Sequence, residues 1–141
     1  MIKVWTNGCF DILHRGHIEM FRYAKSLGDE LVVGIDTDEK VKLDKGDNRP
    51  INNLQDRMYM LQSIKYIDKV IPFDSTEDLS KTIRWYQPDL MVIGSDWKGK
   101  DVIGREFSDK LVFFNRVGDY STTNILEYDK TPVCRERSLD V

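Results

Sequence analysis

Short runs of β-branched and apolar residues alternate with amphipathic helical patterns along most of the chain, and this alternation limits the possible folds more than any other feature. Residues 31–33 and 90–93 are apolar without a break, which is typical of strands buried on both faces. Alternating helices and buried strands predict an α/β fold with a doubly wound parallel sheet. An antiparallel α+β domain would need two-residue hairpin turns between apolar runs, and the sequence has none.

The boundaries follow from the same patterns. The expected strands are residues 2–6, 30–36, 69–72, 89–93 and 110–114. The expected helices are residues 18–26, 54–64 and 78–86, with a last one that opens near Ser121. In sheets of this kind ligands bind beyond the carboxyl ends of the strands, where the strand order reverses. Candidate functional residues are therefore expected directly after each strand.

Length and composition restrict the class of protein. A chain of 141 residues fits one domain, and a net charge of −3 argues against binding to nucleic acid. The longest apolar runs are about six residues, too short to cross a membrane. Two cysteines, Cys9 and Cys134, make neither a disulfide framework nor a Cys-x-x-Cys zinc pair. With no secretory signal before the first strand, a cytoplasmic location is expected.

The only two histidines of the chain, His14 and His17, lie close together at the start of the first helix. At this spacing they can face one point, and Gly16 between them lets a ligand come close. Two donors beside a helix N-terminus suit a phosphate whose charge rises in a transition state. A zinc site would need further ligands, for which only Asp11 and Cys9 are near. A role as helix caps or packed core is the other alternative.

The segment that holds both histidines, residues 8–17, reads Gly-Cys-Phe-Asp-Ile-Leu-His-Arg-Gly-His. It resembles the Gly-x-Phe-Asp-x-x-His-x-Gly-His signature of the small cytidylyltransferase-like nucleotidyltransferases. Residues 116–122, Arg-Val-Gly-Asp-Tyr-Ser-Thr, are similar to a second signature of that family, Arg-Thr-x-Gly-Ile-Ser-Thr. The resemblance extends over residues 3–125. It implies a single Rossmann-like nucleotidyltransferase domain over residues 1–127 and a C-terminal extension over residues 128–141.

The resemblance implies transfer of a nucleoside monophosphate from an NTP to the phosphate of a small acceptor, with release of pyrophosphate. The acceptor phosphate is the nucleophile, so catalysis rests on positioning and charge stabilisation, with no protein nucleophile. His14 and His17 are expected to contact the α-phosphate. The other signature residues expected in nucleotide binding are Gly8, Cys9, Phe10, Asp11 and Gly16. Cys9 stands at a variable position, and Asp11 is either a cap at the helix entry or an orienter of the loop.

A basic segment follows the second strand and contains Lys40, Lys42, Lys45 and Arg49. Lys40 and Lys42 are interpreted as solvated surface. Lys45, in a flexible loop bounded by glycine and proline, is the lysine that the resemblance places on the triphosphate as a catalytic residue. Arg57 matches a family arginine that holds the acceptor phosphate. Without the resemblance, Arg57 would be interpreted as an exposed arginine on a helix surface.

Residues after the fourth and fifth strands complete the expected site. By the resemblance, Ser121 and Thr122 bind the β- and γ-phosphates, although serine and threonine at a helix start are ordinarily N-caps. Arg116, at the head of the same segment, is expected to be catalytic. Asp96 and Trp97 are the candidates for base selection. The resemblance also implies Mg²⁺ bridging the phosphates, for which no protein ligand is identified, and a homodimer.

Two subfamilies compete for the substrates. Residues 65–72 and 96–100, together with Arg116, approach the pattern of the glycerol-3-phosphate cytidylyltransferases. Residues 45–52, 88–90 and 121–125 approach that of the heptose-1-phosphate adenylyltransferases, which are often fused to a sugar kinase. CTP and glycerol 3-phosphate are the favoured pair, because Arg116 lies in the nucleotide-phosphate segment. ATP and heptose 1-phosphate are the alternative.

Two other classes of protein stay open. A catalytically silent nucleotide-binding domain would keep the fold, although the presence of both histidines, Lys45, Arg57 and Ser121 argues against it. A metal-dependent hydrolase would use the two histidines as ligands. Nucleotide binding without turnover would support the first class, and bound zinc the second.

Overall fold

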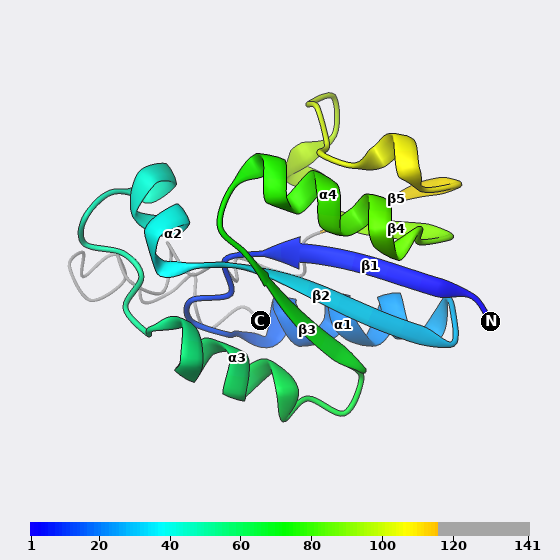
Figure 1. Cartoon of the computed structure of the whole chain (residues 1–141). Coiled ribbons are helices and arrows are strands. Elements are labelled where there is room, and N and C mark those ends of the chain that lie inside the picture. The colour runs from blue at the N-terminus through cyan, green and yellow to red at the C-terminus, as the bar shows by residue number, and fades with distance from the viewer. Residues whose placement is uncertain (116–141) are drawn as a thin grey trace.

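A computed structural model describes residues 1–115, which form one five-stranded sheet with helices on both faces (Figure 1). The strands are β1 (Lys3–Gly8), β2 (Glu30–Asp36), β3 (Lys69–Phe73), β4 (Leu90–Gly94) and β5 (Lys110–Phe114). All pairings are parallel, in the order β3-β2-β1-β4-β5. The predicted doubly wound parallel α/β sheet is confirmed, and each strand begins and ends within two residues of its expected bounds.

The helices divide between the two faces of the sheet. They are α1 (Arg15–Ser26), α2 (Asp38–Lys45), α3 (Leu54–Gln62) and α4 (Thr76–Tyr86), with the short 3₁₀ helices η1 (Ser95–Trp97) and η2 (Arg105–Phe107). Helices α1 and α3 cover one face and α4 covers the other (Figure 1). The helix expected near Ser121 lies outside the described residues. This layering is the one that buried parallel strands require.

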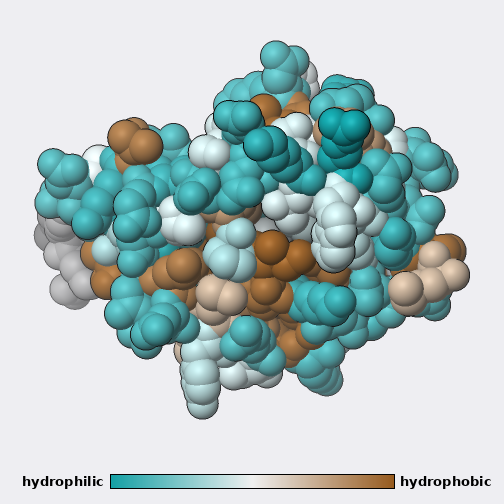
Figure 2. Space-filling model, in the orientation of Figure 1, coloured by the Kyte–Doolittle hydropathy of each residue, from teal (hydrophilic) through white to brown (hydrophobic). Residues whose placement is uncertain are grey.

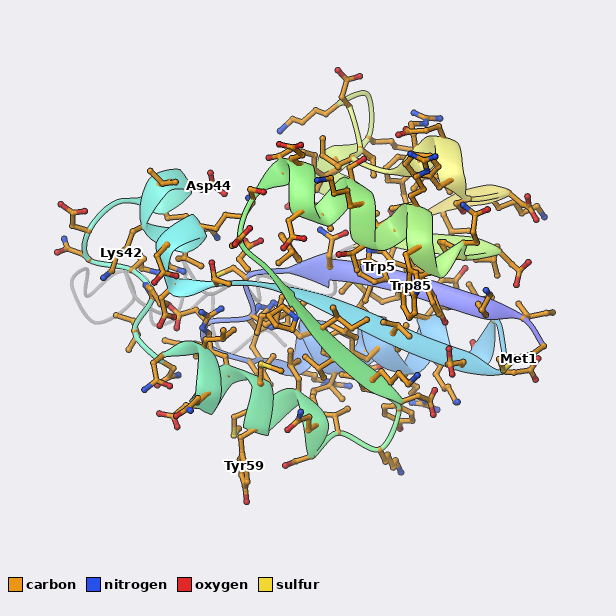
Figure 3. All side chains as sticks on the ribbon, in the orientation of Figure 1. Met1, Trp5, Lys42, Asp44, Tyr59 and Trp85 are labelled. Atoms are coloured by element: carbon orange, nitrogen blue, oxygen red, sulfur yellow. The ribbon has the colours of Figure 1, made fainter. Side chains whose placement is uncertain are left out.

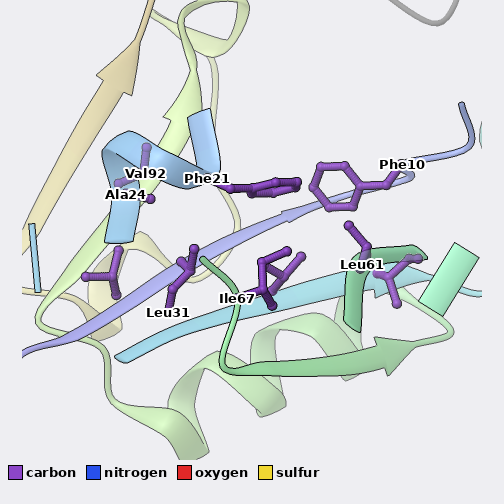
Figure 4. Packing of buried hydrophobic residues seen from close by; sticks show 10 residues of the cluster. Phe10, Phe21, Ala24, Leu31, Leu61, Ile67 and Val92 are labelled. Carbon is purple, nitrogen blue, oxygen red and sulfur yellow. The ribbon is translucent and has the colours of Figure 1, made fainter. Parts of the chain in front are cut away.

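Two hydrophobic clusters fill the space between the sheet and its helices. The first joins β1 and β2 to α1 and α3, and Figure 4 shows the rings of Phe10 and Phe21 next to each other in it. The second joins the opposite face of the sheet to α4 and contains Trp5 and Ile83. Val4 and Trp5 are both fully buried, although they point to opposite faces. The unbroken apolar runs of the sequence reflect this burial on both faces.

The basic segment from Lys40 to Arg49 was expected to be a loop, but its first part, up to Lys45, belongs to helix α2. Val41 is the single buried residue of this helix, so the sequence carries no apolar stripe to reveal it. The sequence signals for this helix are the capping residues at its two ends. The Thr37 hydroxyl accepts a hydrogen bond from the Lys40 N–H, and Gly46 ends the helix with a positive φ of 98°. Lys45 is therefore the last residue of a helix.

The outer surface is largely polar. Figure 2 shows a mostly hydrophilic face with apolar side chains across its middle. Tyr59 of α3 and Trp85 of α4 project into solvent, with 70% and 73% of their surface exposed (Figure 3). Within residues 1–115, no helix is long and apolar enough to cross a membrane.

Gly34 of β2 lies where no side chain fits, which gives a test of the packing. A Cβ at Gly34 would lie 2.5 Å from Cζ2 of Trp5 and 3.1 Å from Cε1 of Phe73, both of which are buried. We expect Gly34→Ala to lower the free energy of unfolding by about 1–3 kcal/mol through overpacking, measured by urea denaturation. Gly94→Ala is the matched control, because a Cβ there would meet nothing within 4 Å. Equal stability of the two variants would show that this close packing is wrong.

Candidate active site

The carboxyl ends of β1 and β4 meet where the strand order reverses, and the predicted site residues gather at this edge. The segment 9–14 follows β1, helix α2 follows β2, and η1 follows β4. Because all five strands are parallel, these three segments leave the sheet on the same side. This is the place where sheets of this type bind ligands.

The two histidines form a reciprocal cap at the start of α1. His14 is the N-cap residue, and its Nδ1 accepts a hydrogen bond from the Gly16 N–H at 3.1 Å. The His17 Nδ1 in turn accepts from the His14 N–H at 3.2 Å. The two rings stack with their centroids 3.8 Å apart. The interpretation as helix caps, which the sequence disfavoured, is therefore correct for one nitrogen of each ring.

This cap also decides where the imidazole protons lie. A neutral imidazole has one acceptor nitrogen and one donor nitrogen, so a ring that accepts at Nδ1 carries its proton on Nε2. Burial, followed by the charges of His14 and Lys45, lowers the pKa of His17 to about 3. His17 is therefore a neutral Nε2–H donor at physiological pH. Capping and hydrogen-bond donation to a ligand use different atoms of the same ring.

The Phe10 ring packs against His17 of the histidine pair. The Phe10 backbone has a positive φ of 48°, and the ring meets His17 edge-on with centroids 5.4 Å apart. Gly8 makes room for that ring, because a Cβ at Gly8 would lie 3.0 Å from Cζ of Phe10. Gly8 and Phe10, two fixed positions of the signature, thus stabilise the packing of His17.

Asp11 holds the loop of residues 49–52 against the histidine segment. Its side chain has no exposed surface. It accepts hydrogen bonds from the Ile51 N–H at 2.7 Å, the Asn52 N–H at 2.9 Å and Arg49 Nε at 3.1 Å. The N-cap of α1 is His14, so the interpretation of Asp11 as a helix-entry cap is wrong, and Asp11 instead joins the histidine segment to residues 49–52.

Arg57 is almost completely buried, with 1% of its surface exposed, so its interpretation as an exposed helix-surface arginine is wrong. Its Nη1 donates to the carbonyl oxygens of Cys9 and Asp36 at 2.9 and 2.8 Å. Nε donates to the Asn52 carbonyl at 2.9 Å, and Nη2 bonds the Asp38 carboxylate at 2.6 Å. Protein acceptors thus take four of the five guanidinium protons, which leaves Arg57 little donor capacity for a ligand. Its role on the acceptor phosphate stays a prediction.

The lysines of α2 differ from one another. Lys45 is exposed, and its charge lowers the pKa of His17, which places it within electrostatic reach of the histidine pair. The pKa of the Cys9 thiol is raised by burial, and the charge of Lys45 opposes that shift. Lys42 is exposed, as expected. Lys40 is not simply solvated surface, because its side chain is 14% exposed and its Nζ lies 2.7 Å from the Asp44 carboxylate.

The remaining predicted residues lie after β4 or outside the described part of the chain. Asp96 and Trp97 belong to η1 at the carboxyl end of β4, and half of the Trp97 surface is exposed. Arg116, Ser121 and Thr122 lie outside the described residues. Residues 1–115 contain no group of three or more His, Cys, Asp or Glu side chains arranged to hold a metal ion. The zinc site considered from the sequence therefore lacks a ligand set among them.

The lowered pKa of His17 predicts how stability depends on pH. The folded ring has a pKa of about 3, below the ordinary value of 6.5, so the unfolded chain binds the extra proton first. The contribution of His17 is complete above about pH 6.5 and is lost as the pH falls toward about 3. Urea denaturation between these values should show a steeper loss in the wild type than in His17→Gln, which keeps a capping acceptor. Equal slopes, or titration of His17 near pH 6.5 by NMR, would contradict this.

Comparison with known proteins agrees with the geometry. Residues 5–133 match the model of the family described as cytidylyltransferase-like. The bifunctional protein HldE of Campylobacter fetus is 47% identical over 123 residues, which cover 87% of this chain and 27% of that protein. The chain thus spans about a quarter of the length of the curated relatives it matches.

Two solved structures share the fold. The lipopolysaccharide core biosynthesis protein of Thermoplasma volcanium aligns with a TM-score of 0.65 and 31% identity, covering 86% of this chain and 99% of that one. The pantothenate synthetase of Thermus thermophilus aligns with the same TM-score at 14% identity, covering 94% of this chain and 66% of that one, and supports the fold alone. The histidine signature at the switch point and the family match lead to one conclusion: the chain belongs to the cytidylyltransferase-like family of nucleotidyltransferases.

Proposed function

We propose that the chain transfers the adenylyl group of ATP to the phosphate of a heptose 1-phosphate and releases pyrophosphate. The observation that carries the proposal is the reciprocal cap at the switch point, which fixes His14 and His17 with their protons on Nε2. Two such donors next to the charge of Lys45 suit an α-phosphate that gains negative charge during substitution. Arg116, Ser121 and Thr122 are proposed, as the second signature implies, to bind the other phosphates.

In the proposed reaction, a phosphate oxygen of the acceptor attacks the α-phosphorus of ATP. The new bond joins the acceptor oxygen to this phosphorus, while the bond from the α-phosphorus to the bridging oxygen breaks and pyrophosphate leaves with it. The two imidazoles donate hydrogen bonds to the α-phosphate oxygens and keep their protons. Lys45 offsets charge on the phosphates. One preorganised donor of this kind contributes about 10²–10³ in kcat.

Mg²⁺ accompanies the triphosphate in this proposal. It needs few protein ligands and is commonly held by substrate phosphates and water. The described residues offer no cluster of carboxylates for it, so the donor set fits an ion carried by the nucleotide better than one bound by the protein. When bound, the ion would neutralise phosphate charge. The homodimer implied by the sequence stays a prediction.

The sequence favoured cytidylyl transfer to glycerol 3-phosphate. The relatives now support adenylyl transfer to a heptose phosphate instead. The HldE relatives are named bifunctional, which fits heptose-1-phosphate adenylyltransferases fused to a sugar kinase. The Thermoplasma volcanium relative is named a lipopolysaccharide core biosynthesis protein, which fits an activated sugar as product. The heptose-type segment 45–52 lies at the candidate site, where its residues bond Asp11 beside the histidines.

The substrate pair is tested by pyrophosphate release with Mg²⁺, crossing ATP and CTP with heptose 1-phosphate and glycerol 3-phosphate. We expect turnover with ATP and heptose 1-phosphate to exceed that of the other three pairs at least tenfold. Faster turnover with CTP and glycerol 3-phosphate would reject the proposed pair and keep the reaction class. Nucleotide binding without turnover in all four would favour the non-catalytic domain.

His14→Asn separates the cap from the chemistry. Asparagine is a good N-cap residue, so this variant keeps an acceptor for the start of α1 and removes the Nε2–H donor. We expect kcat to fall about 10²–10³-fold, with the affinity for the nucleotide by calorimetry and the melting temperature nearly unchanged. Wild-type kcat in this variant would remove His14 from the mechanism.

A further inference from the structure

The guanidinium of Arg49 has a buried donor without a partner. Arg49 lies in the segment between α2 and α3, and its side chain is 14% exposed. Its Nε donates to Asp11 Oδ2 at 3.1 Å, but its Nη2 is buried and makes no hydrogen bond. One other buried side-chain atom in the described part of the chain lacks a partner, the hydroxyl oxygen of Thr6, which is uncharged.

A buried cationic donor in this state is unusual. Leaving a buried polar group unpaired is unfavourable, more so when the group is charged, and each such group in a native protein calls for an explanation. A guanidinium ordinarily pairs with two oxygens of one carboxylate. Asp11 does not complete that pair in this structure: its Oδ1 accepts from the Asn52 N–H, its Oδ2 accepts from the Ile51 N–H and Arg49 Nε, and Arg49 Nη2 bonds neither oxygen. Nη2 of Arg49 is therefore available to donate a hydrogen bond to another anion.

Arg49 and Arg57 differ in this respect. Arg57 directs four of its five donor protons at protein acceptors and has no exposed side-chain surface, so little of its donor capacity is left for a ligand. Arg49 makes one hydrogen bond to a carboxylate that is shared with two backbone N–H groups. Of Arg49 and Arg57, which bond Asp11 and the Cys9 carbonyl respectively, Arg49 is the one with donor capacity left for a ligand.

The position of Arg49 suits the second substrate. Its partner Asp11 precedes the N-cap His14 by three residues, and Lys45, whose charge reaches His17, precedes Arg49 by four. Residues 46–48 and Ile51, on either side of Arg49, are exposed, so a local shift of these residues admits an anion to Nη2 from solvent. We infer that Arg49 Nη2 binds the phosphate of the acceptor and holds it next to the α-phosphate. This inference rests on the proposed nucleotidyl transfer and assigns to Arg49 the role first expected of Arg57.

Arg49→Lys tests the assignment, because lysine keeps a positive charge for Asp11 and cannot supply the forked donor. We expect the KM for the phosphorylated acceptor to rise about ten- to a hundred-fold, with the KM for the nucleotide within twofold of wild type. Arg49→Gln, which also removes the charge, should raise it at least as much. Lys42→Gln is the matched control, because it removes one exposed charge from the neighbouring helix α2 and should leave both KM values unchanged.

An unchanged acceptor KM in both Arg49 variants would overturn the inference, as would an equal rise of both KM values, which indicates a structural role only. Failure of the proposed function is a different result, namely a wild-type protein inactive with every substrate pair. In that case, calorimetric titration with inorganic phosphate tests whether Arg49 forms an anion-binding site. Binding that weakens at least fivefold in Arg49→Gln and not in Lys42→Gln supports the anion site. Equal binding by the three proteins, or no binding to wild type, overturns it.

Discussion

The buried guanidinium of Arg57 ties together the loops on which the candidate site is built. Its hydrogen bonds reach the carbonyl of Cys9 after β1, the carbonyl of Asp36 at the end of β2, and Asp38 at the start of α2. A fourth reaches Asn52, just before α3. A buried cation is tolerated only when it is paired and hydrogen-bonded, so these segments are held at fixed positions relative to one another. The Arg57 hydrogen bonds therefore help to set the positions of the two histidines and Lys45 relative to one another.

In the proposed mechanism, His14 and His17 stabilise the start of α1 through one ring nitrogen and bind the α-phosphate through the other. The Nδ1 atoms of His14 and His17 close the start of α1, and the same bonds place the ring protons on Nε2. Burial, followed by the charges of His14 and Lys45, lowers the pKa of His17 and keeps the ring neutral. A neutral donor stabilises developing charge without giving up its proton. The cap interpretation and the catalytic interpretation of the histidine signature are therefore compatible.

The sequence predicts those parts of this molecule that depend on local pattern. The five strands are found because each is a short run rich in apolar residues, although β3 and β5 are only partly buried, and the histidine pair because its spacing and its place after β1 are both local. Helix α2 is missed because only Val41 is buried, although Thr37 and Gly46 mark its ends. The contacts of Arg57 and Arg49 could not be predicted, because most of their partners, two backbone carbonyls and the carboxylates of Asp38 and Asp11, lie far along the chain. The Cys9 carbonyl, for example, is 48 residues from Arg57.

The central claim is that the acceptor phosphate attacks the α-phosphate directly and that the side chains only position and stabilise. The stereochemistry at the α-phosphorus tests it most directly. The enzyme would turn over a single diastereomer of the α-thio analogue of its nucleotide, and the configuration of the product would be determined by ³¹P NMR. A single in-line displacement predicts inversion. Retention would indicate a nucleotidyl–enzyme intermediate and a protein nucleophile, and would contradict the account.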